Sequence, residues 1–154
     1  MIRTATPDDM PALLDLAREL VAEGRFASFG FIEDKVHARF EALLAGAGVI
    51  FIAERDGEII GGMAAGIGED WFSDVPLTFD YGIYTRHSAR GGIAGGRLVE
   101  AYLTWAAALA PVVNINVGVT SGINQERTIA LYLAIARRLG IHLRVIGAAL
   151  SNMG

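Results

Sequence analysis

The stretch from Leu77 to Leu109 constrains the fold more than any other part of the sequence. Residues 77–85 read Leu-Thr-Phe-Asp-Tyr-Gly-Ile-Tyr-Thr, and this richness in aromatic and β-branched residues predicts a strand. Residues 90–96 read Arg-Gly-Gly-Ile-Ala-Gly-Gly, with four glycines in seven positions. Apolar residues then recur at helical spacing, which predicts a helix over 97–109. The segment is therefore a strand and a helix joined by a glycine-rich turn.

This turn is suited to bind an anion. Glycines carry no Cβ atom, so a ligand can approach their backbone closely. The first turn of a helix adds free N–H groups and the positive end of the helix dipole, a combination that binds phosphate. Arg90 and Arg97 could contribute positive charge. The same glycines would equally suit a turn that only packs the strand tightly against the helix, and both interpretations remain open.

Two common phosphate loops are absent, because the sequence contains neither Gly-Lys-Ser/Thr nor Gly-x-Gly-x-x-Gly. Residues 89–94, Ala-Arg-Gly-Gly-Ile-Ala, resemble instead the coenzyme A loop of the GNAT superfamily of N-acetyltransferases, which reads Arg/Gln-x-x-Gly-x-Gly/Ala. Gly92 and Ala94 occupy the last two fixed positions. Ala89 stands where Arg or Gln is usual, so Arg90 would have to act from the next position.

Further segments resemble a bacterial and phage-like branch of the same superfamily, and together they cover nearly the whole chain. They lie at residues 2–9, 33–36, 53–62, 70–73, 118–120 and 126–132. The resemblance implies an N-acetyltransferase that transfers an acetyl group from acetyl-coenzyme A to an amine, on a small molecule or on a protein. A coenzyme A-binding or dimerising module without turnover is the alternative, and a binder of nucleotide phosphates is a more distant one.

The remaining patterns predict a single α/β (α+β) domain over residues 1–154. A helix begins at Thr6-Pro7 and ends at Gly24, and Asp56-Gly57 predicts a hairpin turn. The predicted order is β α α β β β α β α β, with later elements over 33–45, 49–53, 59–67, 112–119, 125–139 and 141–146. This order predicts a mixed sheet of about six to seven strands with helices on both faces. It is the order of the GNAT fold, although that family normally ends with two strands and few residues follow Gly140.

The resemblance also implies where the coenzyme lies. The pantetheine arm would bond to the backbone of Ile83, Tyr84 and Thr85, in a notch where the fourth and fifth strands separate. The phosphates would meet the backbone N–H groups of the next segment, and Asn124 would form part of the opposite wall. This second group comprises Arg90, Gly91, Gly92, Ile93, Ala94 and Gly95.

Acetyl transfer requires a proton acceptor for the amine and a proton donor for the departing thiolate. The resemblance places a tyrosine acid on the last helix, and counting from Glu126 this residue is Tyr132. Counting back from Gly140 the position falls on Ala136, in which case the acid is missing and Tyr132 is a core aromatic. Asp80 is the foremost candidate base because it lies in the fourth strand. The other acidic candidates are Glu54, Glu69, Asp70 and Asp74.

Composition excludes several other functions. The net charge is −4 and no basic patch is visible, which argues against nucleic acid as a partner. The chain has no cysteine and no histidine cluster, so no metal site is expected. No apolar run is long enough to cross a membrane, no signal-peptide pattern opens the chain, and we expect a cytoplasmic protein. With 53% hydrophobic residues, we also expect a homodimer that covers apolar surface. Trp71 and Phe72 could line an acceptor pocket or anchor their loop to the core.

Overall fold

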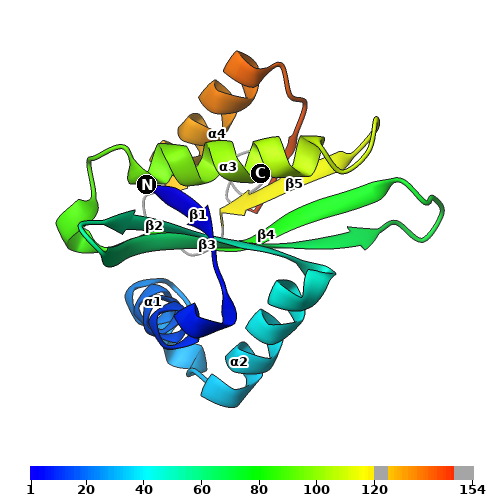
Figure 1. Cartoon of the computed structure of the whole chain (residues 1–154). Coiled ribbons are helices and arrows are strands. Elements are labelled where there is room, and N and C mark those ends of the chain that lie inside the picture. The colour runs from blue at the N-terminus through cyan, green and yellow to red at the C-terminus, as the bar shows by residue number, and fades with distance from the viewer. Residues whose placement is uncertain (120–124, 148–154) are drawn as a thin grey trace.

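The computed structural model describes residues 1–119 and 125–147, and its order of strands and helices confirms the predicted one. Two helices, α1 and α2, cover one face of a mixed sheet, and α3 and α4 cover the other (Figure 1). The elements are β1 (Ile2–Thr4), α1 (Met10–Glu23), α2 (Glu33–Ala42), β2 (Gly48–Arg55), β3 (Glu58–Glu69), β4 (Pro76–Thr85), α3 (Ala94–Ala107), β5 (Asn114–Val119), α4 (Gln125–Leu139) and β6 (Arg144–Gly147).

The sheet has the strand order β1-β2-β3-β4-β5-β6. Neighbouring strands are antiparallel from β1 to β4, and the β4–β5 and β5–β6 pairs are parallel. The predicted hairpin is confirmed: Asp56 and Gly57 both have positive φ, at 54° and 77°, which is the backbone of a two-residue hairpin turn. The mixed sheet of the GNAT fold is therefore present, with six strands in the described residues.

Some predicted boundaries were wrong. Helix α3 begins at Ala94 rather than at Arg97, so two of the loop glycines, Gly95 and Gly96, form its first turn. A Cβ atom on Gly96 would lie 3.7 Å from the Leu131 side chain, an ordinary van der Waals distance, so the packing of α4 does not itself require glycine there. Helix α2 ends at Ala42 and continues as a π-helical turn. Strands β5 and β6 begin later than predicted, at Asn114 and Arg144.

Helix α3 supplies the centre of the larger core. Its apolar residues Leu98, Val99, Tyr102 and Leu103 are fully buried between the sheet and α4. Removing a large apolar side chain from water contributes about 1.5–3 kcal/mol, so this row anchors α3 and the turn that precedes it. The second core lies between the sheet and the helices α1 and α2, and contains Leu13, Leu43, Ile50 and Ile52 among others.

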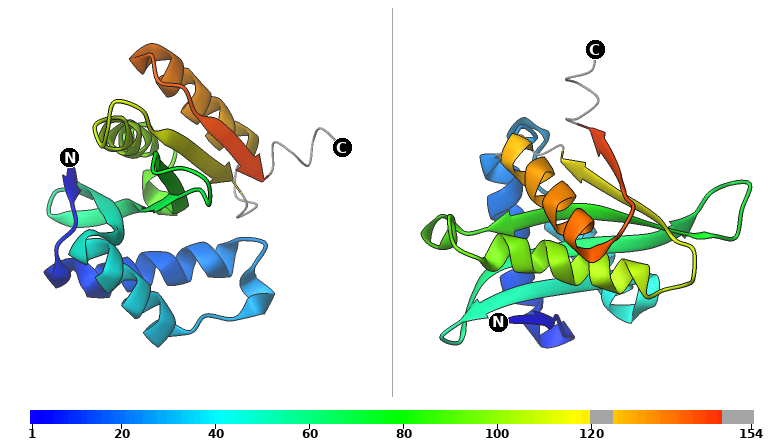
Figure 2. Two further views of the ribbon diagram at one scale, coloured as in Figure 1. Left: turned by 90° about the vertical axis from the view of Figure 1, so that its right-hand side faces the viewer. Right: turned by 90° about the horizontal axis from the view of Figure 1, so that it is seen from above.

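The β3–β4 hairpin extends beyond the rest of the sheet (Figures 1 and 2). Its glycines accommodate aromatic rings of the neighbouring strand, because a Cβ atom on Gly66 would lie 2.6 Å from the Phe79 ring and 3.2 Å from Tyr81. At the hairpin tip Trp71 and Phe72 are 95% and 70% exposed. The interpretation of this pair as anchors to the core is therefore wrong.

Candidate functional site

The site is created where β4 and β5 separate. The two strands pair only at Leu77 with Asn114 and at Thr78 with Ile115, although β4 continues to Thr85. Just beyond this point, hydrogen bonds that involve side chains replace the missing backbone ladder between β4 and β5. The Asn116 amide donates to the Thr78 carbonyl at 3.3 Å, and the Gly118 N–H donates to Oδ1 of Asp80 at 2.7 Å. In the described part of the chain, no further hydrogen bond joins β4 to β5 beyond these two contacts.

A β-bulge in β4 lies at the same place. Ala64 of β3 pairs with Gly82 and Ala65 pairs with Asp80, so Tyr81 is an extra residue without a partner. A bulge increases the local twist of a strand and turns its next residues in a new direction. It therefore bends the end of β4 at the point where β5 has left it.

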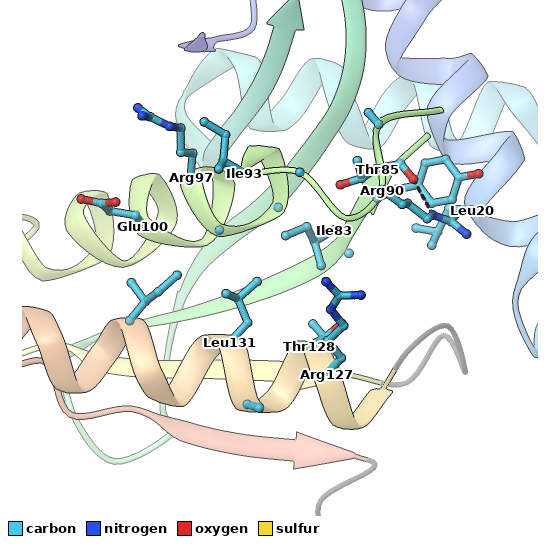
Figure 3. A pocket seen from close by; sticks show the side chains of 18 of the residues that line it. Leu20, Ile83, Thr85, Arg90, Ile93, Arg97, Glu100, Arg127, Thr128 and Leu131 are labelled. Carbon is cyan, nitrogen blue, oxygen red and sulfur yellow. Dashed lines mark hydrogen bonds between the residues drawn. The ribbon is translucent and has the colours of Figure 1, made fainter. Parts of the chain in front are cut away.

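A cavity of about 1050 Å³ fills the resulting notch. Figure 3 shows it between the end of β4, the start of α3 and the side of α4, with Arg127, Thr128 and Leu131 projecting from α4 toward Ile83. The predicted coenzyme residues that line it are Ile83, Tyr84, Thr85, Arg90, Gly91, Gly92, Ile93 and Gly95. Ala94 is buried beneath the turn, and Asn124 lies outside the described residues.

The turn of residues 91–96, of which all but Ala94 line this cavity, carries unused backbone donors. In the described part of the chain none of these N–H groups finds an acceptor, whereas the Arg97 N–H already donates to the Ile93 carbonyl at 3.0 Å. Gly91 has φ of 86°, a conformation that favours glycine, and this directs the turn into the helix. Free amides and the positive end of α3 form an arrangement suited to bind an anion.

Arg90 does not point its charge at these amides. Its guanidinium makes two bonds to the Glu23 carboxylate of α1, at 2.5 and 2.6 Å, and its Nε donates to the Thr85 carbonyl at 2.9 Å. The Arg90 hydrogen bonds lower the pKa of Glu23 to about 2. Burial and the hydrogen bond to Glu23 raise the pKa of Tyr84 to about 12. Arg90 therefore ties the turn to α1, and a contact with phosphate would require this pair to break.

Other cations supply the positive charge of the cavity. Arg97, Arg127 and Arg138 line it, and Arg138 bonds to Glu100 at 3.0 Å. Sequence reasoning missed Glu23 and Arg127. No sequence pattern links Glu23 to Arg90, which is 67 residues away. Arg127, by contrast, lies beside Glu126 in the segment 126–132, which resembles the GNAT superfamily.

The two predicted catalytic residues lie together at the closed end of the notch. The Tyr132 hydroxyl is 3.4 Å from Oδ2 of Asp80 and donates to it. Burial raises the pKa of Asp80 to about 6, against the opposing effect of the bond from Gly118. Burial, and then the charge of Asp80, hold the pKa of Tyr132 well above its usual value. The pKa of Asp80 therefore lies just below neutral pH, where the carboxyl is largely ionised, while the Tyr132 phenol keeps its proton.

Neither residue lines the cavity directly. Tyr132 is fully buried in the main core, and its neighbours Thr128, Leu131 and Ile135 form the wall of the cavity instead. Asp80 is next to Tyr81, and its hydrogen-bond partner Gly118 lines the cavity as well. Ala136, the position of the alternative count, is also buried.

The other candidates for catalytic or metal-binding roles are accounted for differently. Glu54 forms an ion pair with Arg3 at 2.8 Å, and Asp70 accepts a bond from Asn114 at 3.3 Å. Among residues 1–119 and 125–147 no group of three or more His, Asp or Glu side chains is placed to hold a metal ion. Within the same residues no helix combines the length and the apolar character needed to span a bilayer.

A split parallel strand pair beside a helix with free N-terminal amides defines an α/β protein whose sheet edge is suited to an anionic ligand. The family model described as Acetyltransferase (GNAT) family matches residues 14–136. The chain therefore belongs to the acetyltransferase (GNAT) family, and acetyl-coenzyme A is the acetyl donor that this family uses. A search among curated proteins found no match.

Solved structures share the fold. A putative acetyltransferase from Agrobacterium tumefaciens is 24% identical over 88% of this chain and 91% of that one, with a TM-score of 0.67. A ribosomal-protein-alanine N-acetyltransferase from Brucella melitensis is 24% identical over 87% and 82%, with a TM-score of 0.68. AAC(6')-Iy, in complex with the bisubstrate analog CoA-S-monomethyl-acetylneamine, is 24% identical over 92% and 90%, with a TM-score of 0.67.

Proposed function

We propose that this acetyltransferase transfers the acetyl group of acetyl-coenzyme A to an amine. The observation that carries the proposal is the continuity of one cavity, which joins the open edge of β4 to the free amides of residues 91–96. An extended amide-bearing arm fits the first part, and a diphosphate fits the second. Arg97 of α3 and Arg127 of α4 line the cavity from its two sides and supply positive charge.

The chemistry needs one proton removed and one supplied. A bond forms between the amine nitrogen and the carbonyl carbon, the carbon–sulfur bond breaks, the nitrogen loses a proton and the sulfur gains one. The raised pKa of Tyr132 keeps a proton available for the sulfur. Asp80, with a pKa of about 6, is ionised at neutral pH and can restore that proton through their hydrogen bond. Tyr132 is thus the proposed acid, and Asp80 the proposed acceptor of the amine proton.

The test combines binding and turnover. Acetyl-coenzyme A should raise the melting temperature, and an amine panel should then release free thiol. For Gly92→Glu, the same rise in melting temperature should require at least tenfold more acetyl-coenzyme A, because the substitution places bulk and negative charge against the diphosphate. Gly92→Ala is the matched control, since a Cβ atom there meets only the Ala89 carbonyl at 3.4 Å. Equal affinity of wild type and Gly92→Glu would remove the turn from the site.

A coenzyme A-binding module without turnover is the second candidate. The complete burial of Tyr132 favours it, because a core aromatic supplies no proton to a ligand. Stabilisation by coenzyme A with no thiol release across the panel would support this candidate. The homodimer stays a prediction; the exposed Trp71 and Phe72 support it, and sedimentation equilibrium would measure it.

A further inference from the structure

A second cavity, of about 650 Å³, lies on the opposite face of the sheet between α1, α2 and the strands β2 to β4. Its interior is apolar, with Leu13, Leu16, Val36, Phe40 and Met63 among its lining residues. Such a lining favours a ligand with an apolar group, which it removes from water, and offers few hydrogen bonds to a fully polar ligand.

This second cavity reaches the same point of β4 as the first. Tyr81 and Gly82, the residues of the bulge, line both cavities, as do Leu20 and Val21 of α1. A ligand in the second cavity can therefore present one end to the place where the first cavity meets β4. In the proposed function, this place holds the acetyl-bearing end of the coenzyme, where the acceptor amine must arrive.

Among residues 1–119 and 125–147, the charged residues that line the second cavity are two cations of α2, Lys35 and Arg39. They are four residues apart and so share one face of the helix, where like charges repel each other. In the described residues neither has an ion-pair partner, while the nearby acids Glu33 and Glu41 pair with Arg18 and His37. The Arg39 guanidinium lies 5.6 Å from the centre of the Tyr81 ring, at the mouth shared with β4. The pair is thus an unmatched positive site beside an apolar cavity.

We propose that the acceptor is a small apolar amino acid, whose carboxylate bonds to Arg39 and Lys35 and whose side chain fills the second cavity. This inference rests on the proposed acetyl transfer. A guanidinium binds a carboxylate through two parallel hydrogen bonds, which fixes the orientation of the ligand. The amine, one carbon away, then lies near Tyr81 and Gly82. A polycationic amine is excluded from this cavity, because it would bring its charge beside two cations.

Matched pairs of acceptors test the carboxylate. L-phenylalanine and 2-phenylethylamine share one apolar body, as do L-leucine and 3-methylbutylamine. With acetyl-coenzyme A saturating, thiol release should give a higher kcat/KM for the amino acid of each pair. Arg39→Gln should reduce this preference by about tenfold or more, since it removes a charge-assisted hydrogen bond. Arg55→Gln, an exposed cation that lines neither cavity, should keep the preference.

Calorimetry on the coenzyme A-loaded protein supplies an independent measurement. N-acetyl-L-phenylalanine, a product of the proposed reaction, should bind, and Arg39→Gln should weaken it while Arg55→Gln does not. Absence of binding, or turnover that prefers the amine without a carboxylate, would overturn this inference and leave acetyl transfer standing. A protein that neither gains stability from acetyl-coenzyme A nor releases thiol would overturn the proposed function itself.

Discussion

Asp80→Asn is the substitution that most directly tests the chemistry of the notch. The Asp80 carboxyl is half-buried and accepts bonds from the Gly118 N–H and the Tyr132 hydroxyl. An asparagine has the same shape, and its Oδ1 can still accept from Gly118. The substitution therefore removes the titration of this group while it leaves the packing in place.

The magnitude follows from the pKa of the carboxyl. Burial raises the pKa of Asp80 from 3.8 to about 6, so between these pH values the folded protein holds a proton that the unfolded chain has released. Wild type therefore loses stability as pH rises through this range, by about 3 kcal/mol in total. Asp80→Asn has no such loss. Its free energy of unfolding, relative to wild type, should rise by about 2 kcal/mol from pH 4 to pH 7, because the unfolded carboxyl is already more than half ionised at pH 4.

Urea unfolding at half-unit steps of pH measures this difference. Asp9 and Glu23, whose pKa values are lowered to about 2, titrate in both proteins and so cancel. Asp56→Asn, at the exposed hairpin turn, controls for the change of residue type. A relative stability that stays flat from pH 4 to pH 7 would refute the reasoning, because it would mean that water reaches Asp80. A fall toward pH 7 would mean that the charged form is the one the fold stabilises.

Two further substitutions test other parts of the structure. Tyr132→Phe should lower kcat by about a hundredfold with little change in the affinity for acetyl-coenzyme A, because the ring still fills the core; unchanged kcat in a thiol-release assay would retire Tyr132 as the acid. Gly66→Val should lower the free energy of unfolding by about 1–3 kcal/mol, since its Cβ atom would lie 2.6 Å from the Phe79 ring. Gly68→Val on the same strand is the control, because the corresponding distance there is 3.6 Å. Equal melting temperatures for the two variants would contradict this account of β3.

Local patterns in the sequence predicted most of the fold because they act over a few residues. The Asp56-Gly57 turn, the glycine stop at Gly24 and the helical spacing after Gly96 each reflect backbone preference or burial of one face. The sequence did not show which of the loop glycines belong to the turn and which belong to the helix. Glycine disfavours a helix interior, so Gly95 and Gly96 pointed to a turn, yet both lie in the first turn of α3.

The site required contacts that no local pattern contains. The Arg90–Glu23 pair joins the loop to α1, and the contact of Tyr132 with Asp80 joins α4 to β4. The sequence suggested Arg90 as a phosphate ligand because it carries positive charge beside the glycine-rich turn, one position after the usual Arg or Gln of the resembled loop. Here an acid on a distant helix neutralises it, and only the packing of α1 beside the turn reveals this.

The bulge at Tyr81 explains why both cavities meet at β4. Before it, Thr78 contacts Tyr102 of α3 and Asp80 contacts Tyr132 of α4, so even-numbered residues face these helices. After it the alternation is reversed: a Cβ atom on Gly82 would meet Leu20, and Tyr84 bonds to Glu23, both on α1. Because side chains alternate with a period of two, one extra residue is enough to produce this reversal. Tyr81 and Gly82 consequently both face α1 and α2, while Asp80 stays on the other face. The unpaired residue Tyr81 thus places Asp80, the proposed acceptor of the amine proton, on one side of β4 and the cavity proposed for the amine substrate on the other side. At this point β4 has no paired β5 residue to separate the two.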